Sequence, residues 1–313
     1  MTMPNVFQGR LAVPAIAAPM FLVSGPDLVV ACCRAGVVGA FPALNQRTAE
    51  GYAQWLVEIE EKLAVPSDAG GHLPAPFAVN LIVHKSNTRL RQDLEATVAH
   101  AVPLVITSLG AVPDVVDAVH SYGGLVFHDV INMRHAEKAV QAGVDGLIAV
   151  CAGAGGHAGA LSPFALVSEI RSIFGGTVVL SGAMSTGAHI AAARMMGADL
   201  AYLGTRFIAT RESLAPEPYK QMLLDTRAAD ILYTPAISGV AANFLRPSIA
   251  AAGLDPDNLA GHGRMDLSEE AKAWKTIWSA GQGVGSVTDV PGAAELCERL
   301  AREYQEARRK LDF

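Results

Sequence analysis

The chain has 313 residues, of which 51% are hydrophobic and 17% charged, and its formal net charge is −6. Acidic and basic residues are interspersed, so the sequence offers no clustered positive face and argues against a nucleic-acid partner. It also lacks a signal-peptide layout and any run of about 18 apolar residues free of charges and turn signals, so we expect no membrane partner and a cytoplasmic location.

Short apolar runs alternate with helical patterns over the first two-thirds of the chain. Continuous apolar runs are typical of strands that are buried on both faces of a parallel sheet. The expected strands are Ala12–Ala18, Val37–Pro42, Phe77–Ile82, Leu104–Thr107, Leu125–Asp129, Gly146–Val150, Thr177–Ser181 and Leu200–Leu203. The expected helices between them are Pro26–Ala35, Ala49–Leu63, Thr88–His100, Val112–Ser121, Arg134–Ala142, Phe164–Ile173 and Ala188–Met196. This alternation predicts an α/β fold, a closed (β/α)8 TIM barrel, with a doubly wound sheet as the alternative.

The strand–helix rhythm breaks after Thr210. Residues from about 211 to 283 have the pattern of helices and turns, with Tyr219–Arg227 and Ser268–Ser279 as the best helical stretches. We therefore expect a small, mainly helical domain on the substrate side, inserted in a barrel made of residues 1–210 and about 284–313. The charged last helix, Ala293–Leu311, is expected to pack back on the barrel.

Two loops that follow the last two expected strands have the character of a phosphate site. They are LSGAMSTG and YLGTRFIAT, and the residues expected to hold an anion are Gly182, Ala183, Gly204 and Thr205. Small residues let backbone N–H groups approach an anion, and Ser or Thr adds a hydroxyl donor. The alternative is that these glycines only form tight turns.

The loop after the sixth expected strand, VCAGAGGHAGALSP, surrounds His157 with glycines. In such barrels the active site lies at the carboxyl ends of the strands, so His157 is the candidate catalytic residue. Imidazole exchanges protons near neutral pH, and its protonated form can hold an anion. The backbone at Gly155 and Gly156 can lie against a flat ligand. The alternative is a histidine that only caps its own loop.

Three other strand ends carry candidate side chains. Met20 in AAPM could lie against an aromatic ring system, although an ordinary core methionine is as plausible. Asn80 interrupts an apolar strand, and its amide could match a ring edge or satisfy a neighbouring backbone group. His128 and Asp129 are adjacent on one strand and face opposite ways, so only one of them can face the site.

Seven segments taken together resemble the nitronate monooxygenase family, formerly called 2-nitropropane dioxygenases. They are AAPM, AVNLIV, HDVINMRHAEKAVQAGVDGLI, GAGGHAG, LSGAMSTG, LGTRFIATRES and WSAGQGVG, which span nearly the whole chain. The resemblance implies an FMN-binding TIM barrel with a smaller helical domain near the C-terminus. It makes His157 the catalytic base or nitronate-binding residue. The residues expected to contact FMN are Ala18, Pro19, Met20, Asn80, His128, Asp129, Gly155, Gly156, Ser181, Gly182, Ala183, Gly204, Thr205, Ser279 and Gln282.

The activity implied by the resemblance is the oxidation of small apolar nitronates or nitroalkanes with O2 to a carbonyl compound and nitrite. NADH:quinone reductases of the same superfamily carry a GHPGEDD-like stretch after the histidine, whereas this chain has GHAGALSP. Some relatives carry Lys where Asp129 stands, which puts that flavin contact in doubt. The alternatives are an FMN-dependent NAD(P)H:quinone or enoyl reductase, and a flavin-binding protein without turnover. No metal site is expected, because the four cysteines lack zinc-like spacing, and the chain is expected to be a monomer or homodimer.

Overall fold

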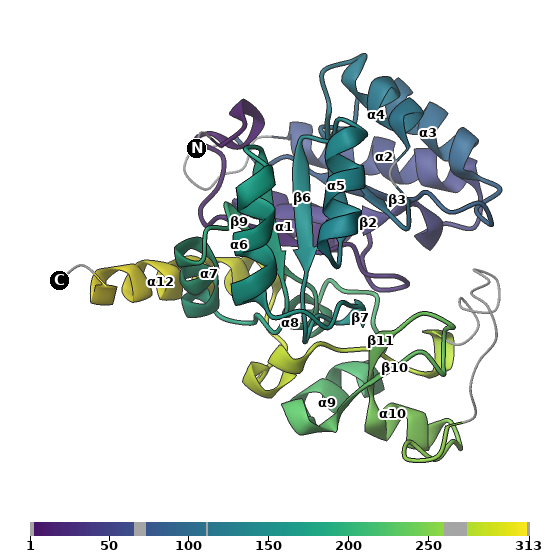
Figure 1. Cartoon of the computed structure of the whole chain (residues 1–313), viewed down its shortest axis with the longest axis vertical. Helices are drawn as coiled ribbons and strands as arrows, with labels where there is room; N and C mark the ends of the chain where they lie inside the picture. The colour runs from purple at the N-terminus through teal and green to yellow at the C-terminus, as the bar shows by residue number, and fades with distance from the viewer. Residues whose placement is uncertain (1–2, 66–72, 111, 260–273, 312–313) are drawn as a thin grey trace.

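A closed barrel of eight parallel strands forms the body of the molecule (Figure 1). The computed structural model describes residues 3–65, 73–110, 112–259 and 274–311. The barrel strands are β1 (Ala15–Ala17), β2 (Val38–Pro42), β3 (Ala78–Ile82), β4 (Leu104–Ser108), β5 (Leu125–Val130), β6 (Gly146–Val150), β8 (Thr177–Ser181) and β9 (Leu200–Leu203). Because β1 pairs with both β2 and β9, the sheet is closed. The predicted TIM barrel is confirmed and the doubly wound sheet is excluded.

The barrel helices begin where the sequence supplies caps. They are α1 (Pro26–Arg34), α2 (Ala49–Ala64), α3 (Leu90–Ala99), α4 (Pro113–His120), α5 (Met133–Gln141), α6 (Pro163–Ile173) and α7 (Gly187–Met195). Side chains of Thr48, Asn132 and Thr186 accept a backbone N–H at the start of α2, α5 and α7. Proline occupies the first turn of α1, α4 and α6, where its missing N–H costs no bond. The helices are therefore delimited largely by local chemistry.

The last helix, α12 (Ala293–Leu311), packs on α7 and α1, as expected for a helix that closes back on the barrel. The helices α7 and α12 are in close contact at Gly187 of α7. A Cβ at this position would lie 2.3 Å from the backbone oxygen of Leu300 and 2.3 Å from the backbone nitrogen of Tyr304, so only glycine fits there. No helix in the described part of the chain is long and apolar enough to cross a membrane.

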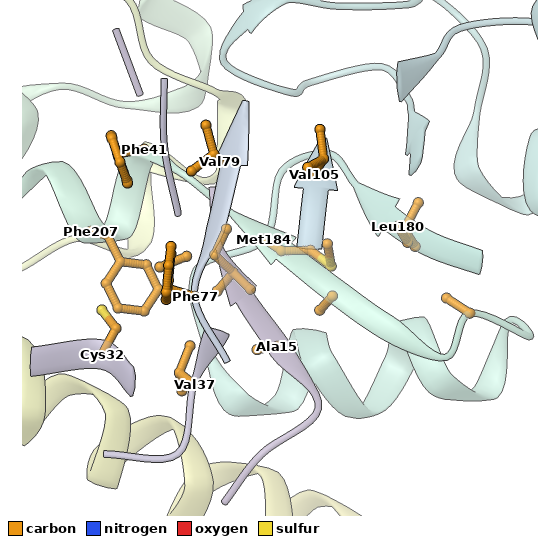
Figure 2. Packing of buried hydrophobic residues seen from close by; sticks show 14 of the residues in the cluster. Ala15, Cys32, Val37, Phe41, Phe77, Val79, Val105, Leu180, Met184 and Phe207 are labelled. Atoms are coloured by element: carbon orange, nitrogen blue, oxygen red, sulfur yellow. The ribbon is translucent and has the colours of Figure 1, made fainter. Parts of the chain in front are cut away.

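Two apolar layers follow from the alternation of side chains along the strands. Inward-facing residues such as Ile16, Ile106 and Phe127 fill the barrel, and Phe7 packs on them. Outward-facing residues pack against the helices in a larger cluster, and Figure 2 shows members of it from strands and helices, including Val79 and Phe207. The filled interior leaves the carboxyl ends of the strands as the place for a site.

The segment after the barrel strands lies on one side of the barrel mouth, below it in Figure 1. It contains α8 (Thr205–Ile208), α9 (Glu217–Asp225), β10 (Ile231–Thr234), β11 (Ala242–Leu245) and α10 (Arg246–Ala251). We call residues 211–259 and 274–281 the cap.

Four short 3-10 helices are found in the described part of the chain. Two lie near the N-terminus, η1 (Asn5–Phe7) and η2 (Ala43–Asn45), and two lie after the barrel strands, η3 (Ala228–Asp230) and η4 (Gln282–Ser286).

The cap also contains strands, which corrects the expectation of helices and turns alone. β10 and β11 form an antiparallel sheet whose third member is β7 (Gly156–His157), from the loop after β6. The helix expected over Ser268–Ser279 is wrong at its end: Trp274–Thr276 are helical, whereas Ser279 forms a β-bridge with Phe244. Residues 268–273 of that expected helix lie outside the described part of the chain. The cap sheet thus joins residues far apart in the sequence.

Candidate active site

A cavity of about 670 Å³ opens at the carboxyl ends of the barrel strands and is bounded on one side by the cap. The predicted site residues that line it are Ala18, Pro19, Met20, Asn80, Asp129, Gly155, Gly156, His157, Ser181, Gly204, Thr205 and Ser279. Four predicted residues, His128, Gly182, Ala183 and Gln282, are not among its lining residues. The structure therefore brings most of the sequence candidates to one place.

His157 lies on β7, so its position is set by the cap sheet as well as by the barrel. It pairs with Ala242 of β11, and its ring lies edge-on to Trp274 with centroids 6.0 Å apart and planes at 89°. The Gly156 N–H donates to Ser279 Oγ at 2.7 Å, and Gly156 has a φ of +69°, which favours glycine. The glycine-rich loop is thereby held by bonds that cross from barrel to cap.

Ser279 and Asn243 complete this attachment of the loop. Ser279 Oγ donates to the Asn243 backbone oxygen at 2.6 Å, and Asn243 Nδ2 donates to the Ala154 oxygen at 2.6 Å. Asn243 is 2% exposed, and sequence inspection missed it because it lies on a strand that was not expected. Ser279 was expected to contact the flavin. Ser279 lines the cavity, and its hydroxyl has two protein partners, which gives it a part in holding the His157 loop.

Replacing Ser279 with alanine should therefore misplace His157. The change leaves the Gly156 N–H without its acceptor, which costs about 1–3 kcal/mol of stability. We expect kcat to fall about tenfold, because the catalytic role predicted for His157 would be sensitive to small displacements. Steady-state kinetics and urea unfolding measure both effects. The exposed Ser286, which makes no side-chain hydrogen bond among those described, provides the control Ser286→Ala; an equal effect of both variants would refute the role of Ser279.

Asp129 faces the cavity, and a line of hydrogen bonds connects it to β3 and β4. Asn80 Nδ2 donates to Ser108 Oγ at 2.7 Å, and Ser108 Oγ donates to Asp129 Oδ2 at 2.5 Å. Burial raises the pKa of Asp129 to about 6, although the Ser108 hydrogen bond and the charge of His157 act in the opposite direction. Tyr202 also lines the cavity, and burial together with the Asp129 charge raises its pKa well above the usual value.

His128 is turned away from the cavity, as the pleat of β5 requires once Asp129 faces it. It was expected to contact the cofactor, but it is 5% exposed and its Nδ1 lies 2.7 Å from Thr107 Oγ1. Burial, and then the charge of His135, lowers the pKa of His128 to about 4. Of these two neighbouring residues, Asp129 therefore lines the cavity and His128 is buried in the packed interior.

The lowered pKa of His128 should make the protein sensitive to acid. Between pH 6.5 and 4 the unfolded state binds a proton at this residue that the folded state does not, so stability falls as pH falls through that window. From a shift of this size we expect a loss of about 2 kcal/mol between pH 7 and pH 5. Urea unfolding of the wild type and of His128→Asn at both pH values tests this, and identical pH dependence in the two proteins would contradict it.

The loops expected to bind phosphate differ in what their amides do. The Ala183 N–H donates to the Gly153 oxygen at 3.2 Å, and Gln282 N–H donates to the same oxygen at 2.8 Å, so this turn packs against η4. Gly204 and Thr205 line the cavity at the start of the short helix α8, in which the N–H groups of Phe207 and Ile208 donate to the Gly204 oxygen. Thr205 Oγ1 accepts from the Gly281 N–H at 2.8 Å. An anion would fit the Gly204–Thr205 loop best.

Several lining residues were not predicted from the sequence. Ser108 and Tyr202 lie at the ends of β4 and β9, where the strand-end rule could have found them. The cap aromatics Tyr219 and Trp278 stack with centroids 4.9 Å apart. Arg89 also lines the cavity, and its Nη2 pairs with the buried Asp93 at 2.7 Å. In the described part of the chain, no group of three His, Cys, Asp or Glu side chains is placed to hold a metal ion.

Comparisons with known proteins agree with this arrangement. The family model described as "Nitronate monooxygenase" matches residues 8–303. A nitronate monooxygenase of Paraburkholderia phytofirmans is 28% identical over 346 aligned residues, covering 95% of this chain and 94% of the relative. The solved structure of a nitroalkane oxidase from Streptomyces ansochromogenes has a TM-score of 0.82 at 26% identity, covering 98% of this chain and 100% of the other. FabK from Thermotoga maritima has a TM-score of 0.80 at 22% identity over 99% of both chains, a similarity of fold.

Proposed function

Because this chain belongs to the nitronate monooxygenase family of oxidoreductases, we propose that it binds FMN and oxidises small apolar nitronates with O2 to a carbonyl compound and nitrite. The observation that carries the proposal is the meeting of His157, the Gly204–Thr205 loop and small wall residues around one cavity. The loop suits the phosphate of the cofactor, and His157 suits the reacting end of the substrate.

The lining residues fit a flat cofactor that has an anionic tail. The cavity volume of about 670 Å³ is within the range of ligand pockets, about 300–1,000 Å³. Part of the wall is built from small residues: a Cβ added at Gly204 would point toward Ala18 and Met20, at 3.7 Å from atoms of each, and would narrow the cavity there. Met20 and the amide of Asn80 are the side chains that would hold the ring. Bound FMN would supply the electron acceptor for the reaction.

The chain itself positions the substrate and handles its proton. A neutral nitroalkane must lose its α-proton, and unprotonated His157 is the base within the cavity that we assign to this step. A substrate that is already a nitronate needs no base, and protonated His157 would hold its anionic group instead. The apolar side chains Leu22, Leu44 and Leu109 also line the cavity and would exclude water from the substrate chain.

The absorbance spectrum of the purified protein tests the cofactor. We expect a yellow protein, and nitrite release when an alkyl nitronate is added in air. A colourless protein that does not reconstitute with added FMN would overturn the proposal. A yellow protein that releases no nitrite from a panel of alkyl nitronates would retain the cofactor and exclude the activity.

A second candidate is an FMN-dependent NAD(P)H:quinone or enoyl reductase. The observation in its favour is that Arg47, an exposed cation, also lines the cavity and would suit a negatively charged co-substrate. Anaerobic mixing with NADH distinguishes the two functions. Rapid bleaching of the flavin supports the reductase, and an unchanged spectrum supports the monooxygenase.

A further inference from the structure

The loop between β1 and α1 contains a strained residue in the wall of the cavity. Met20, Phe21, Leu22 and Val23 all line the cavity, and Leu22 has a φ of +60°. A left-handed backbone is uncommon for a residue with a bulky side chain, because its Cβ crowds the following carbonyl oxygen. Such a conformation persists where the surrounding structure enforces it, and it is concentrated at functional sites. A group that holds Leu22 in this conformation is therefore expected beside it.

That group is the side chain of Asn45, on the neighbouring loop after β2. Asn45 Oδ1 accepts from the Leu22 N–H at 2.9 Å. Asn45 Nδ2 donates to the backbone oxygens of Met20, at 3.0 Å, and of Ser24, at 2.8 Å. Because carbonyl oxygens only accept and the N–H only donates, these three bonds fix the orientation of the amide. The strands β1 and β2 pair in the barrel, which brings their two loops together.

The two ends of the loop are anchored without Asn45. Ser24 is buried, and its Oγ accepts from the Met20 N–H at 3.0 Å. The Val23 oxygen accepts from the N–H of Leu214 at 2.9 Å. Among the described residues, by contrast, the bond to Asn45 is the only hydrogen bond made by the backbone of Leu22. Loss of the Asn45 side chain would therefore release Leu22 while the ends of the loop stay in place.

Asn45 lies behind the cavity wall. It is not among the lining residues, whereas its chain neighbours Leu44 and Gln46 are. It can therefore affect a ligand only through the residues that it holds. Leu22 and Leu44, on the two loops that Asn45 links, present apolar side chains to the same cavity. Since one methylene group more or less changes binding in an apolar pocket roughly tenfold or more, the position of Leu22 matters for the choice of ligand.

We propose that Asn45 is a positioning residue that fixes the wall at Leu22 and thereby limits the length of the hydrocarbon chain that the cavity accepts. This inference rests on the proposed function, in which the substrate is an alkyl nitronate, and it adds how one alkyl chain is selected over another. Met20, which we assign to the flavin ring, stays bonded to Ser24 when Asn45 is lost. Substrate selection and cofactor binding are therefore separable in this loop.

Straight-chain carboxylates from propionate to octanoate test the proposal, because a carboxylate has the planar anionic end of a nitronate and is not a substrate of the proposed reaction. In calorimetric titrations of the purified protein, the affinity of the wild type should fall about tenfold at the first chain length that reaches Leu22. In Asn45→Ala this fall should move to longer chains or disappear. Asn45→Asp keeps the shape and the acceptor but loses both donors, so its profile should resemble that of Asn45→Ala.

A double-variant cycle separates this role from a general loss of stability. Leu22→Gly removes the side chain and adopts a φ of +60° without strain, so by itself it should admit longer chains. Because Asn45 acts through Leu22, adding Asn45→Ala to Leu22→Gly should change the chain-length profile by less than about twofold. The matched control is Thr48→Ala, which removes the N-cap of α2 without touching the loop and should keep the wild-type profile.

Hydrogen exchange of the Leu22 amide reports directly whether Asn45 holds the loop, and it should be faster in Asn45→Ala but not in Thr48→Ala. Unchanged exchange in Asn45→Ala would overturn the proposal, as would faster exchange with an unchanged chain-length profile. Additive effects of Asn45→Ala and Leu22→Gly, or a wild type that binds no carboxylate of any length, would overturn it too. Carboxylate binding involves no turnover, so a protein that has the expected profile but releases no nitrite contradicts the proposed function alone.

Discussion

Replacing His157 with asparagine should lower turnover of a neutral nitroalkane about 10²–10⁴-fold, the range that general-base catalysis contributes. Asparagine cannot take the α-proton, whereas it can still donate a hydrogen bond to an anion. Turnover of the preformed nitronate should therefore fall much less. Nitrite release from the two forms of one substrate, assayed before they interconvert, measures the difference.

The matched control is His135→Asn, because His135 is exposed on α5 and is not among the cavity-lining residues. It should leave both rates close to those of the wild type. Equal losses for nitroalkane and nitronate in His157→Asn would show that the imidazole binds the anion and does not act as a base. Full activity of His157→Asn with both substrates would exclude either role.

Replacing Asp289 with alanine should destabilise the protein by about 3 kcal/mol, because it leaves a buried guanidinium without its counter-ion. Arg206 follows the Gly204–Thr205 loop on α8 and is 3% exposed, and its Nη2 lies 2.6 Å from Asp289 Oδ1. Asp289 also binds Arg299 of α12 at 2.7 Å. Burial lowers the pKa of Arg206, although the charge of Asp289 acts to raise it.

Urea unfolding at pH 7 measures this loss, and Asp27→Ala is the control. Asp27 pairs with Lys62 at 2.7 Å, but its side chain is 74% exposed, so its loss should cost less than about 1 kcal/mol. The double variant Asp289→Ala with Arg206→Met should recover part of the stability, since no buried charge remains. A cost for Asp289→Ala no larger than that for Asp27→Ala would contradict the assignment.

The barrel could be predicted from the sequence because its signals are local. A strand buried on both faces is apolar throughout, and a glycine such as Gly143 or Gly197, each with positive φ, ends the helix before it. The strand-end rule then placed His157, Asn80 and Gly204 at one mouth. These inferences need only the residues within one strand–helix unit.

The cap could not be predicted in the same way because its sheet depends on distant partners. β7 consists of Gly156–His157 alone, and it is a strand only because β11 pairs with it. The sequence showed that only one of His128 and Asp129 can face the cavity. Which of them does so depends on how the pleat of β5 is oriented relative to the cavity, and this is seen only in the structure. Gly182 was predicted as a phosphate ligand from composition, and composition does not show that an added Cβ there would lie 2.9 Å from the Ala152 oxygen.

The strand that bears His157 is shared between two parts of the molecule, and this has a consequence for how the protein can be recombined. A chimera that takes its barrel from this chain and residues 211–281 from a relative would inherit the imidazole from one parent. The neighbours that hold it, Asn243 and Ser279, would come from the other parent. Exchange of that segment between relatives would therefore change the surroundings of His157, even with every barrel residue left intact.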